Sequence, residues 1–298
     1  MSLTWVSQVT RDEQSAYEYL KQQHCIRRTA PDCIHCNRSM TLVKTGRGDA
    51  FTWRCPSHKN YKLSPRSGSF WSSSKLPFCT IIQLAFCWAH DIRNKTGIEL
   101  TELTDKTVTQ WFQYFRDVCT HKLLQNPIQI GGPNVVVELD ESLMAKRKNN
   151  MGHVVSNRWV FGGICPTTQE GFLVFVERRD AATLLPLIEQ HVLPGSIIHT
   201  DEWAAYNGIH RINVQPPYTH QTVNHTVNFV DPVTQACTNH VENMWKKAKQ
   251  KFKAMCGVND DMLESYLDEF MWRERYGPTG ATALQNLFLH ISQWYPTP

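Results

Sequence analysis

Residues 134–141, NVVVELDE, form the stretch that decides the fold of the second half of this chain. Three consecutive valines and a leucine predict a buried β-strand, and the run ends in the carboxylates of Asp140 and Glu141. A Gly-Gly-Pro sequence at 131–133 precedes it, and there the hydrophobic periodicity changes from helical to strand-like. We therefore expect a new domain to begin near residue 129.

The segments that follow have a recognisable order. Residues 158–164 and 171–176 are expected to be two further strands joined by a turn. A helix at 181–192, a buried strand at 196–201 and a short helical turn at 202–206 come next. Three strands, a helix, a strand and a helix, closed by a long helix, is the order of the ribonuclease-H-like α/β fold. Because its first and fourth strands lie side by side, Asp140 and Asp201 should be neighbours.

A third carboxylate comes from the long helix predicted to begin at residue 239. Glu242 is one position away from the apolar stripe, on the same side as the basic residues Lys246, Lys249 and Lys253. This helix is expected to pack through Val241, Met244, Trp245, Ala248, Phe252 and Met255. Glu242 could then face the edge of the sheet while the lysines bind phosphate.

Three converging carboxylates would raise one another's pKa unless cations neutralise them. Oxygen ligands suit Mg²⁺ or Mn²⁺, and two such ions about 3.5–4 Å apart can activate water or a DNA 3′-hydroxyl and stabilise the leaving oxygen. We therefore expect Asp140, Asp201 and Glu242 to be catalytic ligands of two divalent ions. Each acid also has a structural interpretation. Asp140 could merely end a strand, Asp201 could cap the turn before Trp203, and Glu242 has capping-box spacing from Asn239.

The first half of the chain contains two short-spaced pairs of metal-ligand residues. Cys33 and Cys36 form one pair, and eighteen residues later Cys55 and His58 form another with the same spacing. Such pairs, joined by a predicted hairpin at 40–44 and 50–54, are typical of a zinc ribbon with one structural Zn²⁺. Unrelated buried thiols are the alternative, and His35 or Cys25 could replace His58 as the fourth ligand.

The charge of the chain is asymmetric. Residues 1–130 carry 17 basic and 10 acidic residues, whereas the remainder carries 14 and 17. Within 38–75 basic residues alternate with aromatic ones, and we expect Arg54, Lys62 and Arg66 to bind DNA phosphates. A solvated basic surface is the alternative.

A helical region follows the ribbon. Residues 78–92 have helical apolar spacing, and residues 100–116 predict a turn and a second helix capped by Thr104 or Asp105. The inward residues are expected to be Val108, Trp111, Phe112 and Phe115. This resembles a helix-turn-helix that presents Lys106, Thr109 and Gln110 to DNA, although a plain helical bundle has the same pattern.

Composition excludes several classes of protein. A hydrophobic fraction of 41% and a charged fraction of 19% exclude disorder, collagen and coiled coil. No apolar run approaches the roughly 18 residues that span a bilayer, and the N-terminal residues do not resemble a signal peptide. We therefore expect an intracellular protein, without a membrane partner, whose ten cysteines stay reduced.

Five blocks of sequence carry a family resemblance. They are 137–141 (VELDE), 199–206 (HTDEWAAY), 223–230 (VNHTVNFV), 238–249 (TNHVENMWKKAK) and 266–273 (YLDEFMWR). Together they resemble the Merlin-type DDE transposases and their bacterial insertion-sequence relatives, over residues 33 to about 275. The resemblance implies that Asp140, Asp201 and Glu242 are the metal-binding triad of a cut-and-paste transposase acting on terminal inverted repeats. His225 matches a characteristic histidine to which we assign no role, and His58 stands where bacterial relatives usually have cysteine.

The predicted organisation is an N-terminal helix and zinc ribbon at 1–75, a helical DNA-binding region at 76–128 and a ribonuclease-H-like catalytic domain with C-terminal helices at 129–298. The expected function is a transposase that cleaves and joins strands of double-stranded DNA as a homo-oligomer. It would act in the nucleus of a eukaryote or otherwise in the cytoplasm. The alternatives are a domesticated, catalytically silent DNA-binding protein and a ribonuclease-H-like nuclease.

Overall fold

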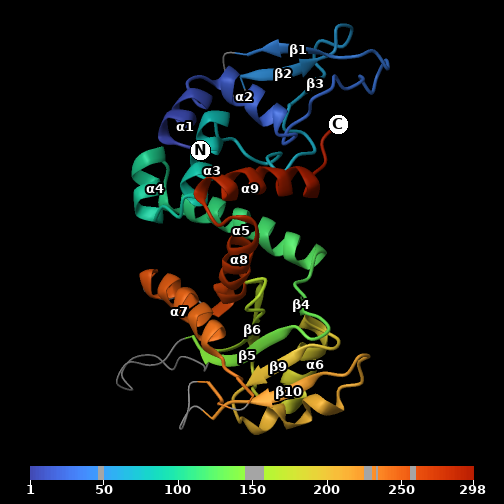
Figure 1. Cartoon of the computed structure of the whole chain (residues 1–298). Helices are drawn as coiled ribbons and strands as arrows, with labels where there is room; N and C mark the ends of the chain where they lie inside the picture. Colours follow the sequence, from blue (N-terminus) through green and yellow to red (C-terminus); the bar gives the residue numbers. More distant parts are fainter. Residues whose placement is uncertain (46–49, 145–157, 225–229, 233, 256–259) are drawn as a thin grey trace. The chain divides into compact units, whose positions relative to one another are not determined.

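The computed structural model describes residues 1–45, 50–144, 158–224, 230–232, 234–255 and 260–298. The chain forms two compact units, one of residues 1–122 with 276–298 and one of residues 123–275 (Figure 1). Residues 276–298, which the sequence groups with those after 129, thus cluster with the first unit. The physical reason is that the last helix, α9 (Gly280–Trp294), buries Leu284, Leu287 and Phe288 and packs against helix α3 (Phe78–Ala89).

The N-terminal part of the first unit contains two helices and a small antiparallel sheet. The helices are α1 (Leu3–Val9) and α2 (Glu13–Gln22), and the strands are β1 (Thr41–Lys44), β2 (Phe51–Arg54) and β3 (Lys62–Leu63). The antiparallel pairing of β1 with β2 confirms the predicted hairpin. A small buried cluster of Cys33, Met40, Trp53 and Cys55 lies against it. So few apolar side chains make a weak core, and a metal would add the missing stabilisation.

The rest of the first unit is helical. Helix α3 is followed by α4 (Asn94–Thr101) and α5 (Asp105–Gln125). The Thr104 hydroxyl accepts a hydrogen bond from the backbone N–H of Thr107 at 3.3 Å, so the predicted cap is present. The predicted inward residues of α5 are all buried: Val108, Trp111, Phe112 and Phe115. Among the described residues, no helix has both the length and the apolar character that a bilayer span requires.

The second unit is built on a five-stranded mixed sheet in the order β10-β9-β5-β6-β7. The strands are β5 (Val136–Leu143), β6 (Trp159–Ile164), β7 (Gly171–Val176), β9 (Ile197–Thr200) and β10 (Thr219–Thr222). A separate parallel pair joins β4 (Ile130–Gly131) to β8 (Val192–Leu193). The three predicted strands β5, β6 and β7 form an antiparallel meander, as expected.

Strand β5 pairs in parallel with β9, which confirms that the first and fourth predicted strands are neighbours. Strand β10 was not predicted. It extends the sheet beyond β9 in parallel, yet its sequence, THQT, has no apolar residue and so lacks the hydrophobic pattern of a strand. The predicted helical turn at 202–206 overlaps a 3-10 segment, η1 (Ala204–Arg211), which begins two residues later and extends further, and the predicted helix before β9 is α6 (Ala181–His191).

Two helices cover the meander. Helix α7 (Asn239–Ala254) contacts β5 and β6, and α8 (Leu263–Tyr276) joins the same apolar cluster after the short η2 (Asp260–Met262). The predicted inward residues Val241, Met244, Trp245, Ala248 and Phe252 are buried, and Met255 is partly buried. Gly162 of β6 permits this packing, because a Cβ there would lie 2.7 Å from the Trp245 ring. The absence of a side chain therefore lets the indole lie against the sheet.

Candidate active site and metal centre

Asp140 lies within β5, which continues to Leu143, so the interpretation that it merely ends a strand is wrong, and Asp201 directly follows the last residue of the neighbouring β9. The parallel pairing continues to within two residues of both aspartates. The indole Nε1–H of Trp245 donates to Asp140 Oδ2 at 3.1 Å and holds that carboxylate in place. The backbone N–H of Trp203 donates to Asp201 Oδ1 at 2.9 Å, so the turn-capping contact considered for Asp201 is present and occupies one of its oxygens.

The surroundings of Asp140 and Glu141 disfavour the ionised form of their carboxyl groups. Burial, followed by the charge of Glu141 and, more weakly, that of Asp201, raises the pKa of Asp140 to about 7. Burial also raises the pKa of Glu141 to about 7, although the hydroxyl of Tyr206 donates a hydrogen bond to Glu141 and opposes the rise. Three carboxylates thus share a region where a divalent cation would relieve their repulsion. Glu141 was not predicted as a site residue, although it directly follows Asp140.

Glu242 lies on the exposed side of the first turn of α7. It precedes Trp245 by three residues, so the two side chains are neighbours on the helix surface. Among the described residues, Glu242 makes no hydrogen bond or ion pair with Asp140 or Asp201. The capping-box interpretation of Glu242 is wrong, because the N-cap residue of α7 is Thr238, which makes no side-chain capping bond. The role of Glu242 as third ligand remains a prediction.

The predicted basic stripe of α7 is present. Lys246, Lys249 and Lys253 are exposed along the same side as Glu242. The ammonium of Lys249 donates to the Ser142 hydroxyl at 2.5 Å, two residues beyond Asp140 on β5. The stripe therefore lies beside the part of β5 that carries the candidate acid.

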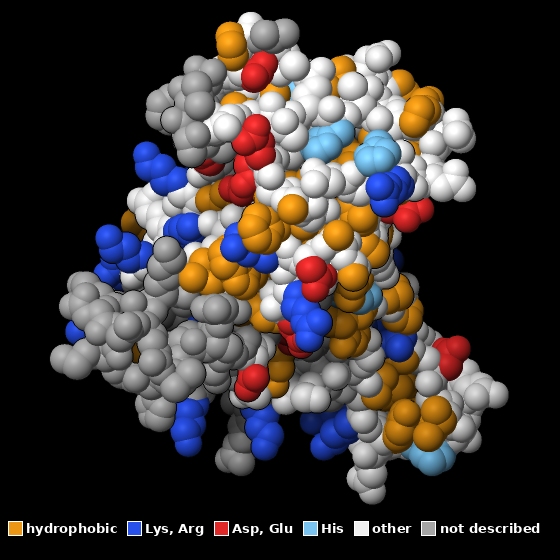
Figure 2. All heavy atoms as spheres, turned by 90° about the horizontal axis from the view of Figure 1, so that it is seen from below, with side chains coloured by type: hydrophobic (Ala, Val, Ile, Leu, Met, Phe, Trp, Pro, Cys, Tyr) orange, Lys and Arg blue, Asp and Glu red, His pale blue; other side chains and the backbone are white. Residues whose placement is uncertain are grey.

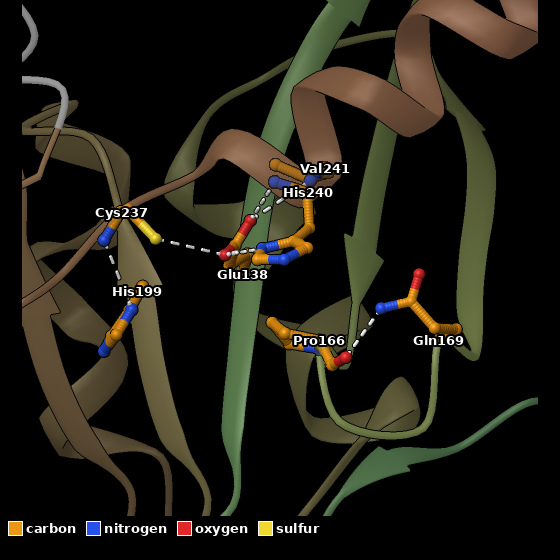
Figure 3. A network of polar contacts seen from close by, with 7 residues as sticks. All are labelled: Glu138, Pro166, Gln169, His199, Cys237, His240 and Val241. Atoms are coloured by element: carbon orange, nitrogen blue, oxygen red, sulfur yellow. Dashed lines mark hydrogen bonds and ion pairs between the residues drawn. The ribbon is translucent and has the colours of Figure 1, made fainter.

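A single buried carboxylate attaches the start of α7 to the sheet (Figure 3). Glu138 of β5 is fully buried, and its Oε2 accepts the backbone N–H groups of His240 at 2.7 Å and Val241 at 3.1 Å. Its Oε1 accepts His240 Nδ1 at 2.7 Å and the Cys237 thiol at 3.3 Å. The carboxylate thus takes the place of the missing side-chain cap and is stabilised by the helix N-terminus. This residue was not predicted.

Glu138, Cys237 and His240 also have the ligand types of a metal site, with all three ligand atoms within 4.8 Å of one another. The distance from Glu138 Oε1 to His240 Nδ1 decides between the two interpretations. Ligands held tetrahedrally at 2.0–2.1 Å by one zinc ion would lie roughly 3.3 Å apart. The observed 2.7 Å is that of a charge-assisted hydrogen bond, so the group is a structural anchor.

The predicted ribbon ligands converge on one point. Cys33, Cys36, Cys55 and His58 form a single group that could hold a metal ion. Tetrahedral zinc with bonds of about 2.3 Å to sulfur and 2.0–2.1 Å to nitrogen requires sulfur–sulfur and sulfur–nitrogen separations of roughly 3.8 and 3.6 Å. The Cys36 and Cys55 sulfurs are 3.6 Å apart, and His58 Nδ1 is 3.7 Å from the sulfurs of Cys33 and Cys55.

The alternative fourth ligands are wrong. The ring of His35 packs against those of His58 and Tyr61 outside the ligand group, and the buried Cys25 thiol donates to the carbonyl of Phe288 at 3.5 Å. Burial raises the pKa of Cys25 far above its ordinary value, so this thiol stays protonated. His58 therefore completes a ligand set that fits zinc.

The residues predicted to bind DNA differ in accessibility. Lys62, Lys106, Thr109 and Gln110 are exposed, and Arg54 is half-buried. Arg66 is a correction, because it is 1% exposed, donates to the carbonyl of Leu76 at 2.6 Å and lies over the Phe78 ring at 4.1 Å. Its guanidinium supports the chain between ribbon and helices instead of facing phosphate. On the face shown in Figure 2, Lys and Arg side chains are scattered and do not gather in one patch. His225 lies outside the described residues.

Comparison with known proteins identifies the class. Residues 125–275 match the ISXO2-like transposase domain. The match spans half of the chain, and the protein therefore belongs to the ISXO2-like transposase domain family. The matched segment contains Asp140, Asp201 and Glu242. The Merlin type suggested by sequence remains a prediction.

Two individual proteins are also similar. An uncharacterized transposase-like protein of Haemophilus influenzae is 30% identical over 102 residues, which cover 34% of this chain and 78% of that protein. A chain of the cryo-EM structure of the simian T-cell lymphotropic virus intasome in complex with PP2A regulatory subunit B56 gamma is 15% identical, with a TM-score of 0.33. That alignment covers 64% of this chain and 67% of the other, and its low score supports no conclusion about the fold.

We predict that the purified protein contains one zinc ion per chain, held by the ribbon. Cys33→Ser should lower the zinc content, measured by plasma mass spectrometry, to under half an ion per chain, because three ligands bind zinc more weakly than four. Cys25→Ser is the matched control and should leave the content unchanged. Equal loss of zinc in both variants would contradict the ligand assignment.

We predict that Glu138→Gln loosens the start of α7. Loss of the charge removes an ion-stabilised cap and should destabilise the second unit by about 1–3 kcal/mol. Hydrogen exchange at the backbone amides of His240 and Val241 should accelerate. Glu274→Gln, which breaks an exposed pair with Lys247 on the same helix, should change stability by less than about 1 kcal/mol. Unchanged exchange in the Glu138 variant would refute the anchor.

The raised pKa values predict how stability depends on pH. Because Asp140 and Glu141 titrate near 7 in the folded protein and near 4 when unfolded, the folded state holds extra protons between these values. Their contribution to stability therefore falls as pH rises through that window without metal. Added Mg²⁺ should raise the melting temperature more at pH 8 than at pH 5.5, since it binds the ionised carboxylates. An equal rise at both pH values, or an undiminished rise in Asp140→Asn, would contradict this.

Proposed function

We propose that this protein is a DNA transposase that cleaves and joins DNA strands with two divalent metal ions. The observation that carries the proposal is the position of Asp140 and Asp201 two residues beyond the last pair of the parallel strands β5 and β9, where burial and neighbouring carboxylates raise the pKa of Asp140. Membership of a transposase domain family supports the same reaction class.

The order and pairing of the strands support a ribonuclease-H-like fold for the second unit. An antiparallel meander is extended from its first strand by two parallel strands, β9 and β10. This order places Asp140 and Asp201 just beyond the last paired residues of β5 and β9, and α7 packs against β5 and β6. The proposed triad is therefore Asp140, Asp201 and Glu242. Glu141 is close enough for its charge to raise the pKa of Asp140.

The chain's own residues prepare the acids for cation binding. The Trp245 indole and the backbone N–H of Glu141, 2.8 Å from Asp140 Oδ1, hold both oxygens of that carboxylate in fixed directions. The Trp203 N–H does the same for one oxygen of Asp201. When bound, Mg²⁺ or Mn²⁺ would lower the pKa of water or a 3′-hydroxyl and stabilise charge on the leaving oxygen. The exposed Lys246 and Lys253 would bind phosphates of the same DNA.

We further propose that the first unit recognises DNA ends. Lys106, Thr109 and Gln110 are exposed on the first turns of α5, which follows α4 after a short turn, as in a helix-turn-helix. Lys62 is exposed on the zinc-ribbon sheet. The amide and hydroxyl groups could contact bases, whereas the lysines would bind phosphates, so affinity should fall steeply with salt.

We predict that the purified protein, with Mg²⁺ or Mn²⁺, nicks a labelled duplex that carries the terminal repeat flanking its own coding sequence. Asp140→Asn, Asp201→Asn and Glu242→Gln should each lower the cleavage rate at least about 100-fold, because loss of one ligand removes several kcal/mol of charge stabilisation. Glu264→Gln, an exposed carboxylate of the second unit, is the control and should cleave normally.

The pattern of products separates the alternatives. Strand joining to a target duplex supports a transposase, whereas cleavage without joining indicates a nuclease. No cleavage by wild type, with DNA binding retained, would favour a catalytically silent DNA-binding protein. Normal cleavage by Glu242→Gln alone would remove Glu242 from the triad while leaving the two aspartates.

A further inference from the structure

An exposed tryptophan stands directly beside the candidate active site. Trp203, two residues after Asp201, is 40% exposed, which is unusual for a side chain of its size. The guanidinium of Arg179 lies 4.4 Å from its ring and 4.3 Å from the ring of Trp159. The three side chains therefore form an indole–guanidinium–indole stack, with Trp203 open to solvent.

This tryptophan is held rigidly. Its indole Nε1–H donates to the backbone carbonyl of Arg179 at 3.0 Å, and its backbone N–H donates to Asp201. Burial raises the pKa of Glu141, and the positive charge of Arg179 is close enough to oppose a small part of that rise. The position of the ring relative to the acids is thus fixed before any ligand binds, and little conformational entropy would be lost on stacking.

The stack lines a shallow surface depression that is largely open to solvent. The other lining residues are Glu177, Arg178, Asp180, Ala181, Ala204 and Ala205. The carboxylate of Asp180 accepts hydrogen bonds from the backbone N–H and the hydroxyl of Thr183 at the start of α6.

An exposed indole ring beside two guanidinium groups suits the binding of a single unpaired nucleotide of any base. An exposed ring face binds a base by stacking, and the nearby guanidinium groups of Arg178 and Arg179 attract its phosphate. A paired base inside a duplex hides both of its faces, so only an unpaired nucleotide fits. Bases near a cleaved DNA end can separate from their partners, and the acids that would cut the strand are adjacent.

We propose that Trp203, supported by Arg179, stacks an unpaired base at the DNA end and thereby holds the strand next to Asp140 and Asp201. This inference rests on the proposed function, because it takes DNA as the ligand of the same site. Trp203 is a strand-positioning residue that binds any base, since stacking tolerates every sequence. Trp159 supports the other side of the Arg179 guanidinium.

Binding of the full-length protein to two fluorescent duplexes tests the proposal without catalysis. One duplex is blunt and the other carries three unpaired thymidines at one 3′ end, in buffer without Mg²⁺ or Mn²⁺. Trp203→Ala should weaken binding of the unpaired-end duplex about 5- to 100-fold and leave the blunt duplex unchanged. Trp203→Phe should retain affinity within about 3-fold. Tyr295→Ala, which removes an exposed aromatic residue of the other unit, is the control and should have no effect.

Photocrosslinking of the wild-type protein provides a second measurement that does not depend on how a variant folds. An unpaired 5-iodouracil at the 3′ end should form a crosslink that mass spectrometry locates at Trp203. Crosslinks found only at residues other than Trp203 would overturn the proposal. So would an equal loss of affinity for the blunt and the unpaired-end duplex in Trp203→Ala. Neither measurement depends on cleavage. If Trp203 stacks the base but the protein does not cut DNA, the proposed function is refuted and this inference is retained.

Discussion

The second unit depends on the contact between the buried Glu138 carboxylate and the first turn of α7. A buried carboxyl group is costly unless its oxygens are hydrogen-bonded, and Glu138 accepts hydrogen bonds from four donors. Two of those donors are backbone N–H groups of the helix, so the partial positive charge of its N-terminus stabilises the carboxylate. This contact sets where α7 begins on β5. The positions of Trp245 against Asp140 and of Lys249 against Ser142 follow from it.

The candidate active site combines opposing electrostatic requirements. Glu138 is fully buried and accepts four hydrogen bonds, whereas Asp140 and Glu141 are half-buried, lie beside other carboxylates and have raised pKa values. Acids whose pKa is raised in this way are commonly found at functional sites. In the first unit the same logic applies to thiols, since three cysteines and one histidine gather around a core too small to be stable alone. Cations would resolve both situations, with oxygen ligands in one unit and mainly sulfur in the other.

Much of the site could be predicted because its signals are local. The spacing of Cys33, Cys36, Cys55 and His58 indicates zinc without a structure, and hydrophobic periodicity predicts the inward face of α7. Three features could not be predicted in this way. Arg66 appears as one basic residue among many, and only packing on Phe78 shows that it is buried. Strand β10 has no apolar pattern and exists because β9 offers an unpaired edge. Glu138 resembles the other acids of its block, and only the approach of α7 shows that it is an anchor.

The sequence by itself determined the strands of the meander, the helices α6 and α7 and the spacing of the zinc-ligand residues. Local propensity, periodicity and ligand spacing act over a few residues, so they are readable along the chain. Only the tertiary structure decided which side chains are satisfied and which remain open to a ligand. The same carboxyl chemistry is an anchor at Glu138, a titrating acid at Asp140 and an exposed group at Glu242. The physical reason is that burial, donors and neighbouring charge are set by segments about a hundred residues apart in sequence, and these meet only when the sheet and α7 pack together.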